Sequence, residues 1–270
     1  MNVQYFRDAV WVHYRKSGRH ELPWRKTRNP YRILVSEVML QQTQVERVVP
    51  FYIRFIKEFP TARKLARAPL SAALKSWQGL GYNRRAKLLH KAATILADMP
   101  LSAAQRNLVE RLESLPGVGP ATARAIAAFA YNKDVIFVET NIRTAVIHHF
   151  FPWEEKISDA EIEKVLTQVI PNGRAREWYS ALMDYGAHLK RSGISHNVRS
   201  TSYVAQSKFP GSLREARGAI LRELMKGTSS RTRIVNLLGV SRRAQVVIAL
   251  GALKNEGLIC VRKNRVALGA

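Results

Sequence analysis

Apolar residues recur at helical spacing through most of this 270-residue chain, and the period-two alternation of strands is scarce until the last dozen residues. Ile33, Leu34 and Val38 repeat at three to four residues, and Pro50 interrupts the pattern further on. This spacing excludes a β-sheet as the main architecture. We therefore predict a mainly α fold, with an all-helical unit over residues 1–206.

A polar stretch precedes a tail of different composition, predicted to form a separate domain over residues 207–270. Three helical patterns in the tail are followed by two strand-like runs: residues 215–225, 232–238, 242–255, 258–261 and 265–268. Three helices followed by a hairpin is the order of a winged helix. Arg242 and Arg243 follow a glycine-containing turn and open the predicted recognition helix, so we expect them to contact DNA.

The charge balance indicates a polyanionic partner. The chain has 44 Lys and Arg against 20 Asp and Glu, a net charge of +24, and the tail from Lys208 onwards has 13 basic and 3 acidic residues. Such an excess is typical of nucleic-acid binding, because cations neutralise phosphates. The alternative is a solvated basic face, or a packing domain with a basic surface.

Other features limit the cellular context. No stretch of 18 apolar residues predicts a membrane span, and the first residues do not resemble a secretory signal. Cys260 is the lone cysteine, which excludes an internal disulfide and a cysteine-built metal cluster. We expect a cytoplasmic, nucleoid-associated monomer.

Residues 115–119 (Leu-Pro-Gly-Val-Gly) are predicted to turn between two helices. Gly117 and Gly119 lack a Cβ, so the backbone around Val118 can approach another group closely. The following helix, which includes Ala121, points free N–H groups and a partial positive charge at that group. This pattern predicts a helix-hairpin-helix that grips DNA phosphates; an ordinary interhelical turn is the alternative.

Glu37 is the strongest candidate for a catalytic acid. It lies one helical turn from Ile33, Leu34 and Leu40, on an apolar side of its helix. Desolvation there would raise the pKa of the carboxyl group, which suits a general acid. The alternative is an ordinary salt-bridged surface glutamate.

Six strings occur in the order seen in adenine DNA glycosylases, the MutY branch of the helix-hairpin-helix superfamily that also contains endonuclease III. The strings are residues 22–25, 29–31, 36–44, 77–82, 88–93 and 115–119. The resemblance covers residues 5–189 and not the tail. It implies a two-lobed helical fold that flips a base out of double-stranded DNA and cleaves its N-glycosidic bond.

The resemblance also implies roles for individual residues. Glu37 would protonate the departing purine, and Gln42 and Tyr82 would wedge into the base stack beside the opposite base. Residues that match the family's base pocket are Trp24, Arg25 and Asp184. Glu139 occupies the position of the family's aspartate, which faces the positively charged sugar of the transition state. Its charge is displaced by one methylene, and a shift of about 1 Å can alter rates about 100-fold. Its structural alternative is a carboxylate at a helix N-terminus.

Ala121 occupies the position of the Schiff-base lysine of bifunctional relatives, so we predict no lyase activity by that route. The family's iron–sulfur cluster is held by four cysteines, and at the matching positions this chain has Lys190, Asn197, Ser200 and Gln206. None of these side chains is a thiolate, so we predict no cluster and no other cofactor.

The tail also departs from the family's usual C-terminal domain, which is Nudix-like and checks for 8-oxoguanine. The favoured function is monofunctional excision of adenine opposite 8-oxoguanine or guanine in base excision repair. The alternatives are a thymine or uracil mismatch glycosylase on the same scaffold, a catalytically silent lesion-sensing protein, and a transcription regulator that acts through its tail.

Histidine and tryptophan residues are predicted to be structural. His148 and His149 have no further ligands at a metal-binding spacing, so we expect no metal site. Trp11, Trp153 and Trp178 are expected to anchor the core.

Overall fold

The computed structural model describes residues 2–99, 101–102, 104–206 and 208–269. It divides into two compact units, each made of three chain segments. The first comprises Met1–Glu37, Pro100–Ser114 and Val118–Ala205, and the second comprises Val38–Met99, Leu115–Gly117 and Gln206–Ala270. The division into domains 1–206 and 207–270 stays a prediction, and its boundary residue Ser207 lies outside the described residues.

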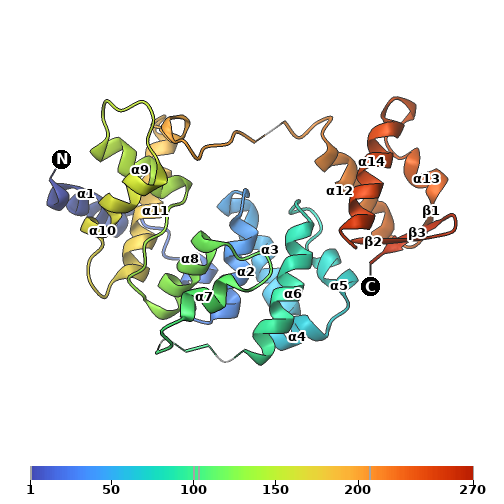
Figure 1. The fold of residues 1–270 in the computed structure, drawn as a ribbon, viewed down its shortest axis with the longest axis horizontal. Helices are drawn as coiled ribbons and strands as arrows, with labels where there is room; N and C mark the ends of the chain where they lie inside the picture. Colours follow the sequence, from blue (N-terminus) through green and yellow to red (C-terminus); the bar gives the residue numbers. More distant parts are fainter. Residues whose placement is uncertain (1, 100, 103, 207, 270) are drawn as a thin grey trace. The chain divides into compact units, whose positions relative to one another are not determined.

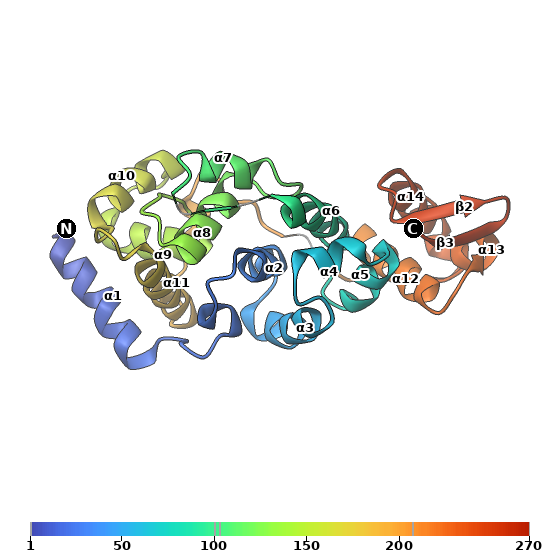
Figure 2. The same cartoon turned by 90° about the horizontal axis from the view of Figure 1, so that it is seen from below.

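The first unit is helical, as predicted. Its elements are α1 (Val3–Ser17), the 3-10 helix η1 (Pro23–Lys26), most of α2 (Pro30–Leu40), α7 (Leu108–Glu113), α8 (Pro120–Tyr131), α9 (Thr140–Phe150), α10 (Asp159–Val169), α11 (Ala175–Arg191) and η2 (Asn197–Arg199). In its core, α9 and α11 lie side by side (Figures 1 and 2). Phe6, Ile142 and Trp178 are fully buried there, so α1 closes over the same core.

The second unit starts with the last residues of α2. It continues with α3 (Val45–Glu58), α4 (Ala62–Arg67), α5 (Leu70–Ser76), α6 (Arg84–Asp98), α12 (Leu213–Met225), α13 (Arg231–Val235), η3 (Val240–Arg242), α14 (Arg243–Asn255) and the strands β1 (Ser229–Ser230), β2 (Ile259–Arg262) and β3 (Arg265–Leu268). The three helices and the hairpin predicted for the tail are present. β1 adds a third strand, in the order β1-β3-β2.

The helix boundary predicted at Pro50 is wrong. The chain leaves the helix at Gln41 to Gln44, and α3 then runs through Pro50. A proline inside a helix removes one backbone hydrogen bond. Val48, Tyr52 and Phe55 bury their side chains on one face of α3, and this packing offsets the loss.

Trp153 is not a core residue, because 88% of it is exposed. It lies in the loop between α9 and α10, so it does not belong to the buried face of a helix. Trp178 is fully buried as predicted, and Trp11 packs against it with ring centroids 5.4 Å apart. Among the described residues, no helix has both the length and the apolar character that a membrane crossing requires.

Candidate active site

Glu37 lies on a helix that is apolar on nearly every side. Tyr31, Ile33, Leu34 and Met39 of α2 are all buried, which is the pattern of a helix enclosed by protein. Glu37 itself is half-buried, and its carboxylate forms no hydrogen bond or ion pair with the described part of the chain. The helix therefore holds an acidic group that has no partner in the part of the chain that the structure describes.

The environment of Glu37 favours the protonated carboxyl. Desolvation raises the pKa of Glu37 to about 8, and the negative charge of Glu139 adds to the shift. An ordinary glutamate is ionised at neutral pH, whereas this one keeps its proton. A carboxylic acid that is protonated at pH 7 can donate that proton to a reacting group.

Glu139 is held in the opposite way, as the N-cap of α9. Its Oε1 accepts hydrogen bonds from the backbone N–H groups of Asn141 and Ile142, each at 2.9 Å, and its Oε2 lies 3.4 Å from Asn141 Nδ2. Donors at a helix N-terminus stabilise negative charge. The structural alternative considered for Glu139 is thus present, and it also fixes a carboxylate close enough to Glu37 to influence its pKa.

Two residues of α11 position the start of α9. Lys190 Nζ donates to Asn141 Oδ1 at 2.9 Å, and the charge of Glu139 acts on the same lysine. Gly186 lies so close to α9 that a Cβ there would be 2.0 Å from the carbonyl oxygen of Asn141. Sequence reasoning missed Gly186, because a glycine inside a helix signals close packing only when its neighbour is known.

Gly186→Ala is expected to lower both stability and activity. The added methyl would push the N-terminus of α9, and Glu139 with it, away from α11. Overpacking of this kind costs about 1–3 kcal/mol, and a displacement of about 1 Å can slow catalysis about 100-fold. Thermal unfolding and single-turnover base release measure the two effects. Gly251→Ala is the control, because a Cβ at that helical glycine meets no atom within 4 Å; equal behaviour of both variants would contradict the prediction.

The predicted pocket residues Arg25 and Asp184 form an ion-pair cluster with Arg19. Asp184 is 1% exposed, and its oxygens lie 2.6 Å from both Arg25 Nη1 and Arg19 Nε. Burial alone would raise the pKa of Asp184, but the hydrogen bonds and charges of the two arginines hold it below its ordinary value. The cluster ties the segment around Trp24, which is also buried, to α11. A role in the base pocket stays a prediction.

Gln42 and Tyr82, the predicted wedge residues, lie in loops of the second unit. Both have left-handed backbone conformations, with φ of 55° and 49°, and such strained residues cluster at functional sites. The buried side chain of Arg85 supports both loops. Its Nη1 donates to the carbonyls of Val38 and Gln41, and its guanidinium lies 5.2 Å from the centroid of the Tyr82 ring.

A cavity of about 1030 Å³ lies beside the same two loops and α12. From α12, Arg214 donates to the Tyr82 hydroxyl at 2.7 Å and also lies over the Tyr82 ring. The sequence did not indicate Arg85 or Arg214, because nothing local distinguishes them among 44 basic residues.

The hairpin has the features expected of a phosphate-binding turn. Gly117 has a φ of 81°, and a Cβ there would be 2.8 Å from the Cβ of Leu88. Val118 is buried, whereas the space beside Gly119 is open. Gly119 is the N-cap of α8 and Ala121 is exposed in its first turn, where no side-chain cap occupies the N–H groups. Contact with phosphate stays a prediction.

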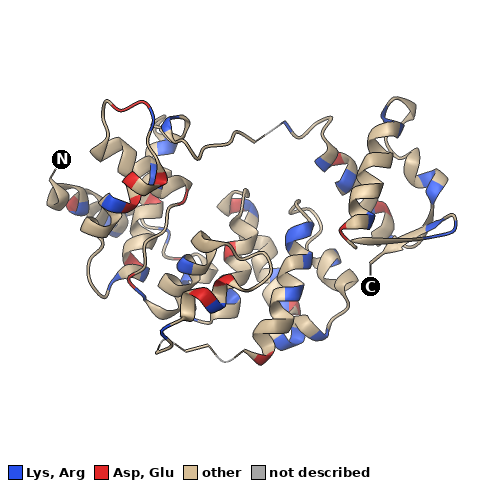
Figure 3. Ribbon diagram, viewed as in Figure 1, with Lys and Arg blue, Asp and Glu red and all other residues tan. Residues whose placement is uncertain are grey.

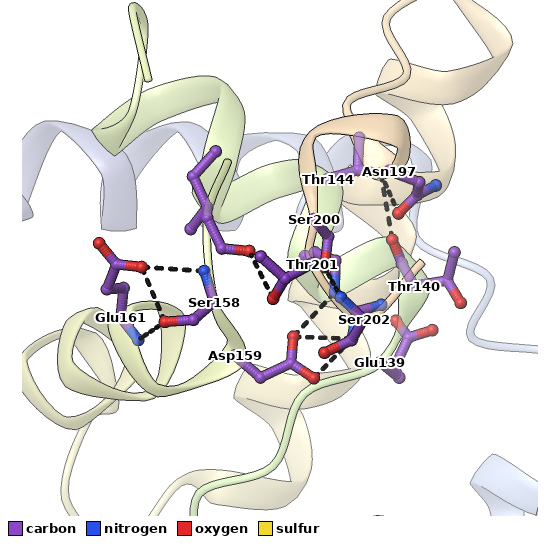
Figure 4. A network of polar contacts seen from close by, with 12 residues as sticks. Glu139, Thr140, Thr144, Ser158, Asp159, Glu161, Asn197, Ser200, Thr201 and Ser202 are labelled. Carbon is purple, nitrogen blue, oxygen red and sulfur yellow. Dashed lines mark hydrogen bonds and ion pairs between the residues drawn. The ribbon is translucent and has the colours of Figure 1, made fainter. Parts of the chain in front are cut away.

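The residues at the family's cluster positions do not fit an iron–sulfur cluster. Asn197 and Ser200 are buried without a thiolate nearby, and no group in the described part of the chain could hold a metal ion. Hydrogen bonds order this loop instead (Figure 4). Thr144 Oγ1 contacts Asn197 Oδ1 at 3.5 Å, and Ile157 pairs with the loop through bonds of 2.8 Å to the Arg199 carbonyl and 3.0 Å from the Thr201 N–H.

The two tail arginines predicted to contact DNA are both engaged within the tail. Arg242 donates to Glu215 Oε2 at 3.0 Å and to Gln245 Oε1 at 2.8 Å, which holds its guanidinium against α12. Arg243 is exposed and donates to Asn236 at 2.6 Å. Their contact with DNA stays a prediction.

Comparison with known proteins gives consistent matches. The profile of the HhH-GPD superfamily base excision DNA repair proteins matches residues 35–172. An adenine DNA glycosylase of Mycolicibacterium smegmatis is 36% identical over 262 residues, which is 90% of this chain and 88% of that protein. One of Buchnera aphidicola is also 36% identical, over 69% of this chain. The chain covers 53% of the Buchnera protein.

Solved structures share the fold. A thermostable thymine-DNA glycosylase aligns with a TM-score of 0.61 and 26% identity, over 72% of this chain and 90% of that one. A non-covalent endonuclease III–DNA complex aligns with a TM-score of 0.55 at 23% identity, over 68% of this chain and 85% of that one.

Proposed function

We propose that this chain, which belongs to the HhH-GPD superfamily of base excision DNA repair proteins and within it to the adenine DNA glycosylases, hydrolyses the N-glycosidic bond of adenine in DNA. The observation that carries the proposal is the pair of carboxyl groups with opposite environments. Glu37 has no hydrogen-bond or ion-pair partner among the described residues and a pKa of about 8, while Glu139 accepts two backbone hydrogen bonds at the N-terminus of α9.

The two carboxyl groups divide the reaction between them. Glu37 gives its proton to the departing adenine, which weakens the bond between the base and the sugar. Positive charge then develops on the sugar, and the carboxylate of Glu139 stabilises it electrostatically. Water adds its hydroxyl group to the sugar carbon and returns its other proton to the Glu37 carboxylate, so the products are free adenine and an abasic site.

DNA binding is assigned to the hairpin and the wedge loops. The first turn of α8 and the backbone of Gly117 to Gly119 grip a phosphate group, while Gln42 and Tyr82 enter the base stack. The left-handed φ values of both wedge residues support this role. Flipping a base costs a few kcal/mol, least at a mismatch, so we assign adenine opposite 8-oxoguanine or guanine as the target. We assign the protein to the nucleoid as a monomer without a cofactor.

A panel of duplexes containing A·8-oxoG, A·G, T·G and U·G tests the proposal. Adenine release from the first two is expected, measured as strands that break only after alkali. Base release from T·G or U·G alone would contradict adenine excision. It would support the second candidate function, a pyrimidine mismatch glycosylase, which the likeness to thymine-DNA glycosylase favours.

The same panel tests for lyase activity. Ala121 offers a methyl group in place of an amine, so no Schiff base forms there. Strands are expected to stay intact before alkali, and borohydride is expected to trap no covalent complex. Cleavage without alkali would show that another lysine attacks the sugar.

A further inference from the structure

The exposed face of the tail helix α14 is poorly suited to reading bases. Val247 and Ile248 are 41% and 59% exposed, and Ala244 and Gly251 share that side of the helix. Readout in the major groove depends mainly on side chains that donate or accept hydrogen bonds. Arg242, at the start of the helix, is held by Glu215. The face of α14 formed by Ala244, Val247, Ile248 and Gly251 therefore offers neither a cation nor a hydrogen-bonding side chain for readout.

The β2–β3 hairpin carries the opposite kind of surface. Arg262, Lys263 and Arg265 are exposed at its tip, and Arg231 follows β1 on the other side of β3 (Figure 3). The backbone N–H of Arg231 donates to the carbonyl of Asn264 at 2.9 Å, which joins the start of α13 to the hairpin turn. None of these four side chains forms an ion pair with the described residues, and we call them the basic wing.

The strand register makes the basic wing costly to the folded protein. Arg262 lies directly opposite Arg265, so the two side chains project from the same face of the sheet. Like charges placed opposite each other across strands destabilise a sheet. Four other tail cations are paired with carboxylates: Arg217 with Glu256, Lys226 and Arg233 with Glu223, and Arg242 with Glu215. The uncompensated cations at this turn thus indicate an anionic partner.

We propose that the basic wing binds the phosphate backbone of double-stranded DNA without reading its sequence. Four exposed cations without an ion-pair partner among the described residues provide phosphate contacts, and their position around a hairpin turn lets an extended polyanion contact several of them. The proposal deepens the proposed function and depends on it only in naming DNA as the partner.

The test compares two double variants of the full chain that each lose two charges. Arg262→Gln/Arg265→Gln alters the basic wing, and the control Lys208→Gln/Lys254→Gln alters two exposed tail cations outside it. Affinity for an undamaged duplex is measured between 50 and 200 mM salt. Each lost phosphate contact lowers the salt-dependence slope by about 0.9, so the wing variant is expected to lose about 1.8. From 50 to 200 mM salt, the factor by which affinity falls should then be about 12 times smaller for the wing variant than for the wild type.

Stability separates loss of binding from loss of folding. Removal of the opposed charges should raise or preserve the melting temperature of Arg262→Gln/Arg265→Gln. If that variant fails to fold, Lys263→Asn replaces it, because asparagine tolerates the φ of 50° at this turn. The proposal is overturned if the control variant loses as much slope as the wing variant, if the wing variant keeps the wild-type slope, or if duplexes of unrelated sequence differ in affinity more than about tenfold. Since the duplex is undamaged, failure here leaves the base-release panel unaffected.

Discussion

Glu37→Gln is expected to abolish adenine release while leaving duplex affinity nearly unchanged. Glutamine matches the size of the protonated carboxyl but cannot give up a proton, and general acid catalysis contributes about 10²–10⁴-fold. Single-turnover release from an A·8-oxoG duplex measures the loss, and a binding assay on the same duplex is the control. Unchanged release would refute the acid role and leave the catalytically silent DNA-binding protein as the better interpretation.

The pH dependence of the wild type follows from the raised pKa of Glu37, about 8. The acid is active when protonated, so release should fall as pH rises through about 8. Because the folded protein holds a proton that the unfolded chain loses near pH 4.5, its stability declines as pH rises between these values. Glu37→Gln removes this decline and should melt at a higher temperature than the wild type at pH 7. A release rate that is flat through pH 8 would contradict the assignment.

Glu139→Gln is expected to produce the second large loss in the rate of adenine release. The amide oxygen can still accept the N–H groups of Asn141 and Ile142, so α9 keeps its cap while the negative charge disappears. Loss of one preorganised electrostatic contact costs about 10²–10³-fold in rate. Glu139→Asp is the matched variant, because aspartate is also a good N-cap and restores the residue implied by the family resemblance.

The Asp variant should lose less activity than Glu139→Gln, since charge and cap are both retained. Melting temperatures of the three proteins should agree within a few degrees, which shows that the Gln variant loses charge and not structure. A Glu139→Gln protein as active as the wild type would leave Glu139 only its capping role.

Much of the helical architecture could be predicted, because the spacing of apolar residues within a short segment is enough to identify a helix. Ile33 and Leu34 mark the apolar environment of Glu37, and the raised pKa agrees with that expectation. The wrong helix boundary at Pro50 has the same origin. The lost backbone hydrogen bond can be inferred from the sequence, but the packing of Tyr52 and Phe55 that offsets it cannot.

The supporting residues could not be predicted because their contacts are distant in the sequence. Arg85 reaches the carbonyl of Val38 across 47 positions, and Lys190 reaches Asn141 across 49. Trp153 was wrongly predicted to be buried, because tryptophan is usually a buried residue type. Its exposure is set by the path of the loop, which the sequence does not reveal. Roles taken from the family resemblance, such as those of Gln42 and Tyr82, still require the measurements above.

The loop that contains Asn197 and Ser200 is ordered by ordinary polar groups and backbone pairing with Ile157. The order of this loop is therefore expected to need no delivery of iron or sulfide by other proteins. Oxidants and iron starvation, which dismantle metal clusters, have no such target among Lys190, Asn197, Ser200 and Gln206. Adenine release by this chain is therefore expected to be unaffected by iron chelators.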